Sequence, residues 1–380
     1  MTVVALLASV TVLVALPIGA AQGAVDLPPG FAQKKVVGAL TKPMDMEFAP
    51  DRRLFIATKD GKVHIAKRDG KLATFLDISA KVATFGERGL QALTFDPNFA
   101  TNHFVYLNYT RKATATDPAH NRIVRVTADG NKAVTGSERL IFRLSEQLDE
   151  TWHQGGAIDF GQDDKLYVAA GDNHIPNNAQ SLSNLHGKML RINKDGTIPT
   201  DNPFYTTASG NNRAIWALGL RNPFKFATRP GTSTIFINDV GQGAWEEINR
   251  GESGANYGWP VYEGPESDAE YTPPIYAYEH GSGTDTTGCA ITGGAFYDPE
   301  TVQFPRGYVG LYFFTDLCNG WIREYDPATE TTSLFATGLS PETGILNGVV
   351  DLEVRKSGEL YYLKKGSDTS SVHKIRYTGN

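Results

Sequence analysis

The stretch "IDFGQDDKLYVAAGD", residues 158–172, decides the fold. A short apolar run is followed by a polar turn and then by a second apolar run. Apolar and polar residues alternate with the period of two that is typical of half-buried strands. The stretch therefore predicts a pair of antiparallel strands, and "GKMLRINKDG" at 187–196 supplies a third.

The same pattern returns along the chain. Its six copies begin at Met46, Leu93, Ile158, Phe224, Gly293 and Leu352. They recur at intervals of about 45 to 70 residues, a spacing typical of the three- or four-stranded blades of a β-propeller. We therefore expect an all-β fold, a six-bladed β-propeller that forms a single domain over residues 25–380.

Composition excludes some classes of partner. The chain has 380 residues, of which 41% are hydrophobic and 21% charged, and its net charge is −6. These values are typical of a folded, soluble protein. Nucleic-acid binding needs a basic surface, and no Lys/Arg-rich run is present, so the sequence predicts no nucleic-acid partner.

The N-terminal residues have the features of an export signal. Residues 1–25 carry no charge and end in small residues, which predicts a signal peptide over residues 1–24. The alternative is an uncleaved anchor, because about 20 apolar residues can span a bilayer. Pro17 and Gly19 favour cleavage, so we expect a secreted or periplasmic protein with no membrane span after cleavage.

The chain has two cysteines, Cys289 and Cys318. In an exported protein a lone pair is most simply one disulfide bond. The alternative is a pair of buried free thiols.

Polar residues stand just before the first strand of each copy. In a propeller these strands line the central channel, so the residues before them gather on one face of the ring. The residues expected around this funnel are Glu87, Arg88, Gln91, His153, Gln154, Arg221 and Asn222. A neutral histidine beside a fixed cation suits proton removal near neutral pH. The simpler alternative is that His153 and Arg221 are turn residues.

A second candidate site is "DVGQGAWEEINRGESGANYGWP", residues 239–260. Its Gly-rich turn exposes backbone carbonyls, and Glu246 and Glu247 add carboxylates. Oxygen donors of this kind suit Ca²⁺ rather than Zn²⁺. An acidic turn without a metal is the alternative.

Several stretches together resemble the soluble pyrroloquinoline quinone (PQQ)-dependent sugar dehydrogenases, the glucose/sorbosone dehydrogenase family. The matching stretches are "ERGLQALTFDPNF" (87–99), "HQGGAIDFGQDDKLYVAAGD" (153–172), "NNAQSLSNLHGKMLRINKDGTIPTDNPF" (177–204), "AIWALGLRNPFKFA" (214–227), the 239–260 stretch and "GCAITGGAFYDP" (288–299). The resemblance extends from about residue 40 to the C-terminus, so it covers nearly the whole mature chain.

The resemblance implies a cofactor and its site. A six-bladed propeller of this family holds PQQ on the axis, and the histidine of its H-x-G-G motif, here His153, is the catalytic base. Arg221 and Asn222 would lie against the quinone oxygens, and Glu87 and Gln154 would approach the cofactor. Calcium would be held by the backbone carbonyls of Gly243 and Ala244. A further calcium would lie near Glu247 and the Tyr257 carbonyl.

The reaction implied is the oxidation of an aldose sugar. His153 would take the proton of the anomeric hydroxyl while C1 delivers hydride to C5 of the quinone. Arg221 and Ca²⁺ would stabilise the charge that grows on the quinone oxygens. The product would be a lactone, and the electrons would pass to an external acceptor.

Two departures from the family pattern reduce the positive charge expected for a tricarboxylate cofactor. Asp298 stands where members commonly carry Arg or Lys, and Trp321 where many carry Arg. The candidates to replace the missing cations are Arg88, Arg323 and Lys225.

The departures favour an alternative function, a non-catalytic propeller that binds a glycan or a protein, as hedgehog-interacting protein does. A third hypothesis, a propeller lactonase, requires an acidic calcium cage on the axis, and the residues expected on the rim are mostly not acidic.

Overall fold

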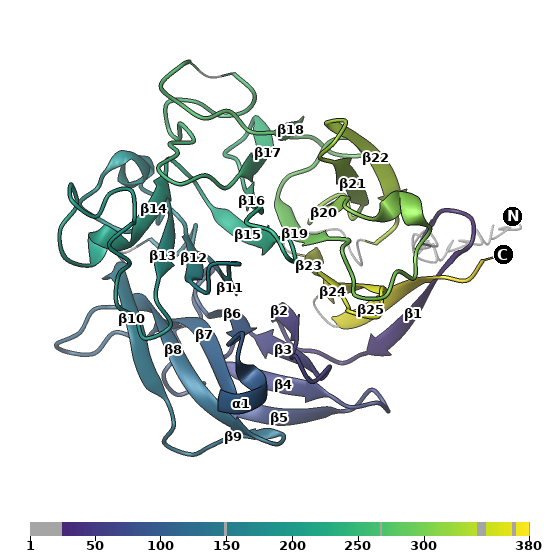
Figure 1. The fold of residues 1–380 in the computed structure, drawn as a ribbon, viewed down its shortest axis with the longest axis horizontal. Coiled ribbons are helices and arrows are strands. Elements are labelled where there is room, and N and C mark those ends of the chain that lie inside the picture. Colours follow the sequence, from purple (N-terminus) through teal and green to yellow (C-terminus); the bar gives the residue numbers. More distant parts are fainter. Residues whose placement is uncertain (1–24, 148–149, 267, 340–346, 367–369, 380) are drawn as a thin grey trace, which may run out of the picture.

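The computed structural model describes residues 25–147, 150–266, 268–339, 347–366 and 370–379. The expected signal peptide lies outside these residues. Six antiparallel sheets are arranged in a ring around a central channel (Figure 1). The predicted six-bladed β-propeller is therefore confirmed. No helix within the described ranges is both long and apolar enough to span a bilayer.

Each of the first three blades runs outward from the axis in chain order. Blade 1 consists of β2 (Pro43–Phe48), β3 (Leu54–Thr58), β4 (Lys62–Ala66) and β5 (Leu72–Asp77). Blade 2 consists of β6 (Leu90–Phe95), α1 (Phe99–Asn102), β7 (Phe104–Arg111), β8 (His120–Asp129), β9 (Lys132–Ala133) and β10 (Arg139–Glu146). Blade 3 consists of β11 (Gly155–Phe160), β12 (Leu166–Ala170), η1 (Pro176–Gln180), β13 (Lys188–Ile192), η2 (Gly210–Ala214) and β14 (Ile215–Leu218).

The next two blades follow the same order. Blade 4 consists of β15 (Pro223–Thr228), β16 (Ile235–Asp239), β17 (Trp245–Arg250) and β18 (Tyr276–Glu279). Blade 5 consists of β19 (Ile291–Phe296), η3 (Arg306–Tyr308), β20 (Tyr312–Asp316), β21 (Ile322–Asp326) and β22 (Thr331–Ala336).

Blade 6 joins the two ends of the chain. Its inner strands are β23 (Gly348–Val354), β24 (Leu360–Lys365) and β25 (Ser371–Tyr377), and its outer strand is β1 (Phe31–Val37). Strand β1 pairs antiparallel with β25, and Figure 1 shows the two side by side. This pairing was not predicted, and it closes the ring with backbone hydrogen bonds instead of leaving two sheet edges open.

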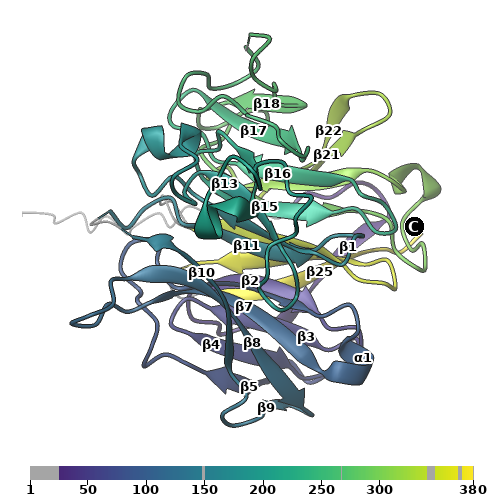
Figure 2. The same cartoon turned by 60° about the vertical axis from the view of Figure 1, so that its left-hand side comes forward.

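Apolar side chains fill the space between neighbouring sheets. Figure 2 shows the sheets of blades 1 and 2 packed against each other, and the core between them includes Phe55, Phe75 and Phe95. The rings of Phe75 and Phe95 each meet the ring of Phe55 edge-on, with centroids 5.0 and 4.9 Å away. Edge-to-face contacts of this kind are a preferred aromatic geometry, and the contact between Phe55 and Phe95 joins blade 1 to blade 2.

The six innermost strands share an irregularity that positions the site. In each of β2, β6, β11, β15, β19 and β23 the register with the next strand shifts near the N-terminal end. A bulge bends the strand locally and re-aims its side chains. The N-terminal ends of the inner strands therefore present both backbone and side chains to the mouth of the channel.

Candidate functional site

A cavity of about 210 Å³ lies at the N-terminal ends of the innermost strands. All six blades contribute to its wall. The lining residues are Met44, Lys59, Gly86, Glu87, Trp152, Asn222, Phe224, Val240, Cys289, Ala290, Thr292, Leu317, Val350 and Lys365. We call it the axial cavity. Of the residues expected around the funnel, Glu87 and Asn222 lie in its wall, and His153 and Arg221 directly adjoin two lining residues in the chain.

His153 is held by a buried acid. Its Nδ1 lies 2.7 Å from Oδ1 of Asp172, which is fully buried at the end of β12. The other oxygen of Asp172 accepts a hydrogen bond of 2.9 Å from Nε1 of Trp259. A carboxylate facing Nδ1 places the proton there and leaves the lone pair on Nε2. The imidazole is therefore arranged to accept a proton at Nε2.

Steric constraints explain the Gly-Gly pair that follows His153 and Gln154. His153 has a φ of 54°, an uncommon conformation for a residue with a side chain, and Gly155 and Gly156 have φ of 57° and 112°. A Cβ on Gly156 would lie 2.5 Å from Cβ of Gln91. A Cβ on Gly171 would lie 2.1 Å from the His153 carbonyl oxygen. The glycines thus permit the tight backbone packing that presents His153.

Arg221 contacts Trp259, the tryptophan that also donates to Asp172. Its Nη1 donates to the carbonyls of Val240 and Gly241 at 3.0 and 2.6 Å, and its guanidinium lies 5.5 Å from the Trp259 ring centroid. The Asp172 N–H donates to the Arg221 carbonyl at 2.8 Å. The two residues expected to act together, His153 and Arg221, are therefore joined through Asp172 and Trp259.

Asn222 connects the two blades that carry these residues. Its side-chain oxygen accepts a hydrogen bond of 2.9 Å from the Gly155 N–H. Asp239, buried at the end of β16, accepts from the backbone N–H groups of Arg221 and Asn222 at 2.9 and 2.7 Å. These contacts fix Arg221 relative to the loop that carries His153.

Glu87 and Gln154 were both expected to approach the cofactor, but of the two only Glu87 lines the axial cavity. Glu87 lines the axial cavity, and its Oε2 accepts a 3.1 Å hydrogen bond from the Gln154 backbone N–H. The side chain of Gln154 is buried and engaged with Gln147 and, at 3.2 Å, with the Trp152 carbonyl. Gln154 therefore uses its side chain within the protein and is not among the residues that line the axial cavity, so its contact with a cofactor stays a prediction.

Lysines that the sequence analysis did not single out give the cavity positive charge. Burial lowers the pKa of Lys365, and Lys59 and Lys42 lower it further, while Glu87 partly offsets them. Burial and Lys42 likewise lower the pKa of Lys59, again partly offset by Glu87. Like charges close together depress one another's pKa, so this end of the cavity favours an anion.

The two departures from the family pattern lie away from the axial cavity. Asp298 follows the C-terminal end of β19, where its carboxylate pairs with Arg229 at 2.6 Å. Trp321 is 1% exposed, packs on Tyr278 and donates Nε1 to the Thr287 carbonyl at 2.9 Å. Neither residue lines the axial cavity, and their effect on cofactor binding stays a prediction.

The suggested replacement cations are also elsewhere. Lys225 is buried further along the channel, where it pairs with Asp45 and Asp351. Nη1 of Arg323 donates to the Asp285 carbonyl at 2.9 Å. Nη2 of Arg88 donates to the Glu150 carbonyl at 3.1 Å. None of the three lines the axial cavity.

The Gly-rich turn encloses a carboxylate. The backbone N–H groups of Gln242, Gly243, Ala244 and Trp245 all point to Oε1 of Glu263, at 2.7 to 3.3 Å. Burial alone would raise the pKa of Glu263, but these donors more than offset it and hold the pKa below its usual value. The amides of the turn thus face Glu263, while the Ala244 carbonyl accepts a 2.9 Å hydrogen bond from the His280 N–H.

Glu247 lies beside another buried acid. It is directly opposite Asp239 in the β16–β17 register. Burial raises the pKa of Glu247 to about 7, and burial and the Glu247 charge raise the pKa of Asp239 well above its usual range. Tyr257 makes its contacts with Leu218 and Arg250 rather than with the Glu247 carboxylate.

These observations test the fit of the two implied groups. Two buried carboxylates that repel each other, Asp239 and Glu247, suit a hard divalent cation such as Ca²⁺. Nε of Arg221 is buried without a hydrogen-bond partner within the described residues, so it is available to an acceptor. A cavity with apolar walls and two lysines suits a flat, anionic cofactor. The residues therefore fit calcium and PQQ.

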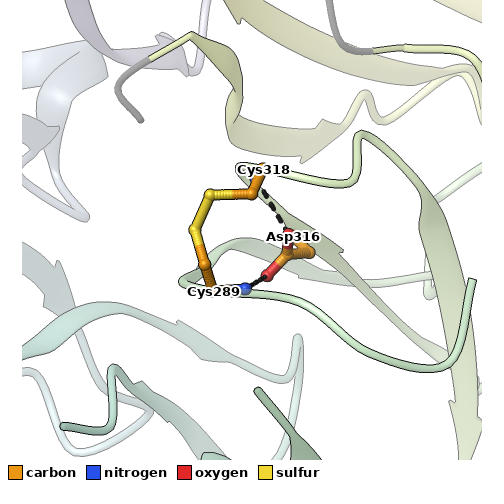
Figure 3. A group of neighbouring side chains, drawn as sticks. All are labelled: Cys289, Asp316 and Cys318. Atoms are coloured by element: carbon orange, nitrogen blue, oxygen red, sulfur yellow. Dashed lines mark hydrogen bonds between the residues drawn. A yellow bond between two sulfur atoms is a disulfide. The ribbon is translucent and has the colours of Figure 1, made fainter. Parts of the chain in front are cut away.

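The expected disulfide is present between Cys289 and Cys318. Figure 3 shows Asp316 beside it, and this carboxylate accepts hydrogen bonds of 2.9 and 2.8 Å from the N–H groups of Cys289 and Cys318. In the described ranges these three form the one cluster with metal-ligand geometry, but the bonded sulfurs offer no thiolate. Their role is to fix the loops that supply Cys289, Ala290 and Leu317 to the cavity wall.

Sequence reasoning missed several residues of this site. Asp172 ends the apolar run "LYVAAGD", and an acid that directly follows a buried strand was a usable signal. Glu263 lies in the long segment between β17 and β18, and no motif indicated it. Lys59 and Lys365 gave no signal, because a lysine in a hairpin is usually solvated.

The chain is similar in sequence to several known proteins. A family model described as Glucose / Sorbosone dehydrogenase matches residues 40–372. The aldose sugar dehydrogenase YliI of Escherichia coli K12 is 29% identical over 291 residues, which cover 72% of this chain and 74% of the relative. Quinoprotein glucose dehydrogenase B of Acinetobacter calcoaceticus is 30% identical over 273 residues, covering 65% of this chain and 56% of that protein.

A solved structure gives the same architecture. The PQQ-bound form of an aldose sugar dehydrogenase from Streptomyces coelicolor superposes with a TM-score of 0.73 at 22% identity, covering 92% of this chain and 99% of that one. At this level of identity the likeness establishes the fold, and function has to be argued from the site.

Proposed function

The chain belongs to the Glucose / Sorbosone dehydrogenase family, and on that premise we propose that it is a PQQ- and calcium-dependent sugar dehydrogenase. It oxidises the C1 hydroxyl of an aldose to the lactone and passes the electrons to an external acceptor. The single observation that carries this proposal is the connected group His153–Asp172–Trp259–Arg221 beside a positively charged axial cavity.

His153 is the proposed general base. With the Nδ1 proton held by Asp172 at 2.7 Å, Nε2 takes the proton of the C1 hydroxyl. Removing that proton makes C1 a better hydride donor, and a positioned base of this kind typically contributes about 10²- to 10⁴-fold in rate. Asp172 keeps the ring in the right tautomer and stabilises the imidazolium that forms.

When bound, PQQ supplies the two-electron acceptor that takes the hydride from C1, so that the sugar loses one proton and one hydride and becomes the lactone. Arg221 provides a fixed positive charge where negative charge grows. Its position is set in advance by the Val240 and Gly241 carbonyls and by the Trp259 ring, so little reorganisation accompanies the reaction.

Calcium would be held by oxygen donors near the 239–264 region. The backbone carbonyls of Gly243 and Ala244 would hold one calcium, and the Glu247 carboxylate and the Tyr257 carbonyl would hold a further one. A divalent cation there relieves the repulsion between Glu247 and Asp239. We also propose that the chain is exported to the periplasm or the exterior after cleavage of residues 1–24.

The test is reconstitution. Purified protein is incubated with Ca²⁺ and PQQ, and reduction of an artificial dye is followed with a panel of aldoses. We expect turnover that requires both additions and is lost on chelation of calcium. Protein that takes up no PQQ and reduces no dye with any aldose contradicts the proposal and favours a non-catalytic binding protein.

A further inference from the structure

We propose that Lys59 and Lys365, on the side of the axial cavity opposite His153 and Arg221, bind the carboxylates of the cofactor and so direct its quinone toward the catalytic pair. This inference rests on the proposed function, because it takes PQQ as the ligand. It assigns a role to two residues of this chain that no motif indicates.

The ring geometry places these lysines together. Lys59 lies in the β3–β4 turn of blade 1, and Lys365 ends β24 of blade 6. Blades 1 and 6 are neighbours on the ring (Figure 1), and both lysines are among the residues that line the axial cavity. His153 and Arg221 precede the inner strands of blades 3 and 4, which lie across the ring from blades 6 and 1.

Among the described residues, neither lysine has an acidic partner in contact with its ammonium group. Nζ of Lys59 donates to the Gly86 carbonyl, and Nζ of Lys365 has no hydrogen-bond or ion-pair partner within the described part of the chain. Glu87 is the one carboxylate among the residues that line the cavity. A partly buried ammonium group without a counter-ion is costly, so a pair of them is expected to have a ligand.

The rest of the cavity fits the proposed ligand. Met44, Phe224, Val240, Leu317 and Val350 give it apolar walls, while the lysines supply charge on one side. PQQ combines a flat ring system with three carboxylates. Blades 1 and 6 therefore supply the positive charge that such a ligand needs.

Lys59 is held in position by its neighbours. The Leu90 N–H donates to the Lys59 carbonyl at 3.2 Å, and a Cβ on Gly89 would lie 2.6 Å from Cγ of Lys59. The lysine stem thus packs against the loop that leads into β6. This contact fixes the ammonium group at the cavity wall and reduces the entropy lost on ligand binding.

The test measures binding and not only turnover. The dissociation constant of PQQ for the apo-protein is obtained in the presence of Ca²⁺ from the quenching of tryptophan fluorescence, to which Trp152 in the cavity wall contributes. Lys59→Met and Lys365→Met are each expected to weaken binding about tenfold and to reduce its salt dependence. Lys364→Met, at the adjacent position of β24, is the matched control and should stay within about twofold.

A second variant guards against unfolding. Lys365→Arg keeps the charge and should bind PQQ within about threefold of the wild type. Competition is an independent measurement on the wild type alone. Benzene-1,3,5-tricarboxylate, which carries the charge without the quinone, should displace PQQ, and rising salt should weaken PQQ binding.

The outcomes separate this inference from the proposed function. Wild-type protein that binds PQQ and oxidises sugars, with Lys59→Met and Lys365→Met binding as tightly, overturns the inference and leaves the function intact. Wild-type protein that binds PQQ through these lysines but oxidises no aldose supports the inference and overturns the activity. Absence of PQQ binding in the presence of Ca²⁺ overturns both.

Discussion

The buried lysines at the two ends of the central channel differ in their partners within the described residues. At the N-terminal end of the inner strands, which we call the site end, Lys59, Lys365 and Glu87 line the axial cavity. The C-terminal end holds a second cavity of about 230 Å³. We call this the acidic end, and its charged lining residues are Asp45, Glu47, Asp159, Lys225, Asp351 and Glu353.

At the acidic end Lys225 pairs with two carboxylates of the protein. Nζ of Lys225 contacts Asp45 and lies 3.0 Å from Oδ1 of Asp351. Asp45 accepts a 2.8 Å hydrogen bond from the Leu93 N–H, and Asp351 one of 2.8 Å from the Met46 N–H. The group therefore ties together blades 1, 2, 4 and 6 across the axis.

The partner of a buried charge indicates whether that charge stabilises the fold or binds a ligand. Burial penalises every charged group, and the penalty has to be offset by a partner. Where the partner is another part of the chain, as for Lys225, the charge holds the fold together. Where no acidic partner is in contact within the described ranges, as for Lys59 and Lys365, the charge favours binding of an anionic ligand.

The largest effect is expected at the site end. His153→Ala removes the proposed base, so kcat for aldose oxidation should fall about 10³-fold. The alanine variant should still bind PQQ within about threefold, because the base acts on the sugar. Dye-coupled assays and fluorescence titration measure the two quantities. Near-normal turnover in this variant would remove His153 from the mechanism.

Breaking the acidic end should affect stability and leave the site untouched. Lys225→Met leaves Asp45 and Asp351 buried without their cation, which should lower the free energy of unfolding by about 3–5 kcal/mol. Urea denaturation measures this loss. The affinity of the folded variant for PQQ should be unchanged, and a large change in that affinity would show that the two ends are coupled.

The support for the base can be tested separately. Asp172→Asn keeps the shape but presents an amide to Nδ1, which favours the tautomer with the proton on Nε2. We expect kcat to fall about 10²-fold with little change in KM. The pH dependence of kcat should also shift, an effect that a purely structural role would not produce. An unaltered pH profile would contradict the positioning role.

The smallest effect concerns pH. Burial, followed by the charges of Asp351, Asp45 and Asp159, holds the pKa of Glu353 well above its usual value, although Lys225 opposes this. The folded protein therefore keeps this proton to a higher pH than the unfolded chain does. Its contribution to stability is present below the unfolded pKa and is lost as the pH rises through the folded pKa.

Glu353→Gln should remove that dependence. The variant should be more stable than the wild type at pH 8 by about 1 kcal/mol, and its stability should vary less with pH above about pH 5. Urea midpoints across this range give the comparison, with Glu330→Gln on the surface as the control. A wild type that gains stability steadily from pH 5 to pH 8 would be inconsistent with this account.

The blades could be predicted from the sequence because their strands are local. Each hairpin has its own alternation and turn residues, as in 158–172, and the recurrence of six copies determines the ring. The closing strand β1 could not be predicted, because its partner β25 lies at the other end of the chain. The short sequence "FAQKKVV" is too polar to indicate a strand of a core sheet.

The site was predictable to the extent that its residues share a position in the repeat. His153 and Arg221 both precede inner strands, so the ring brings them together. Gln154 directly follows His153, but its side chain bonds to Gln147 and to the Trp152 carbonyl, partners that the sequence does not reveal. Lys59 and Lys365 become neighbours only when blade 6 closes on blade 1.

The most direct test of the central claim is an anaerobic single turnover. Protein loaded with Ca²⁺ and one equivalent of PQQ is mixed with one equivalent of an aldose from the panel that it oxidises, and the absorbance of the bound cofactor is followed. We predict that one equivalent of bound quinone is reduced as one equivalent of lactone forms, and that His153→Ala binds the cofactor without reducing it. Bound PQQ that stays oxidised with every aldose would contradict the account.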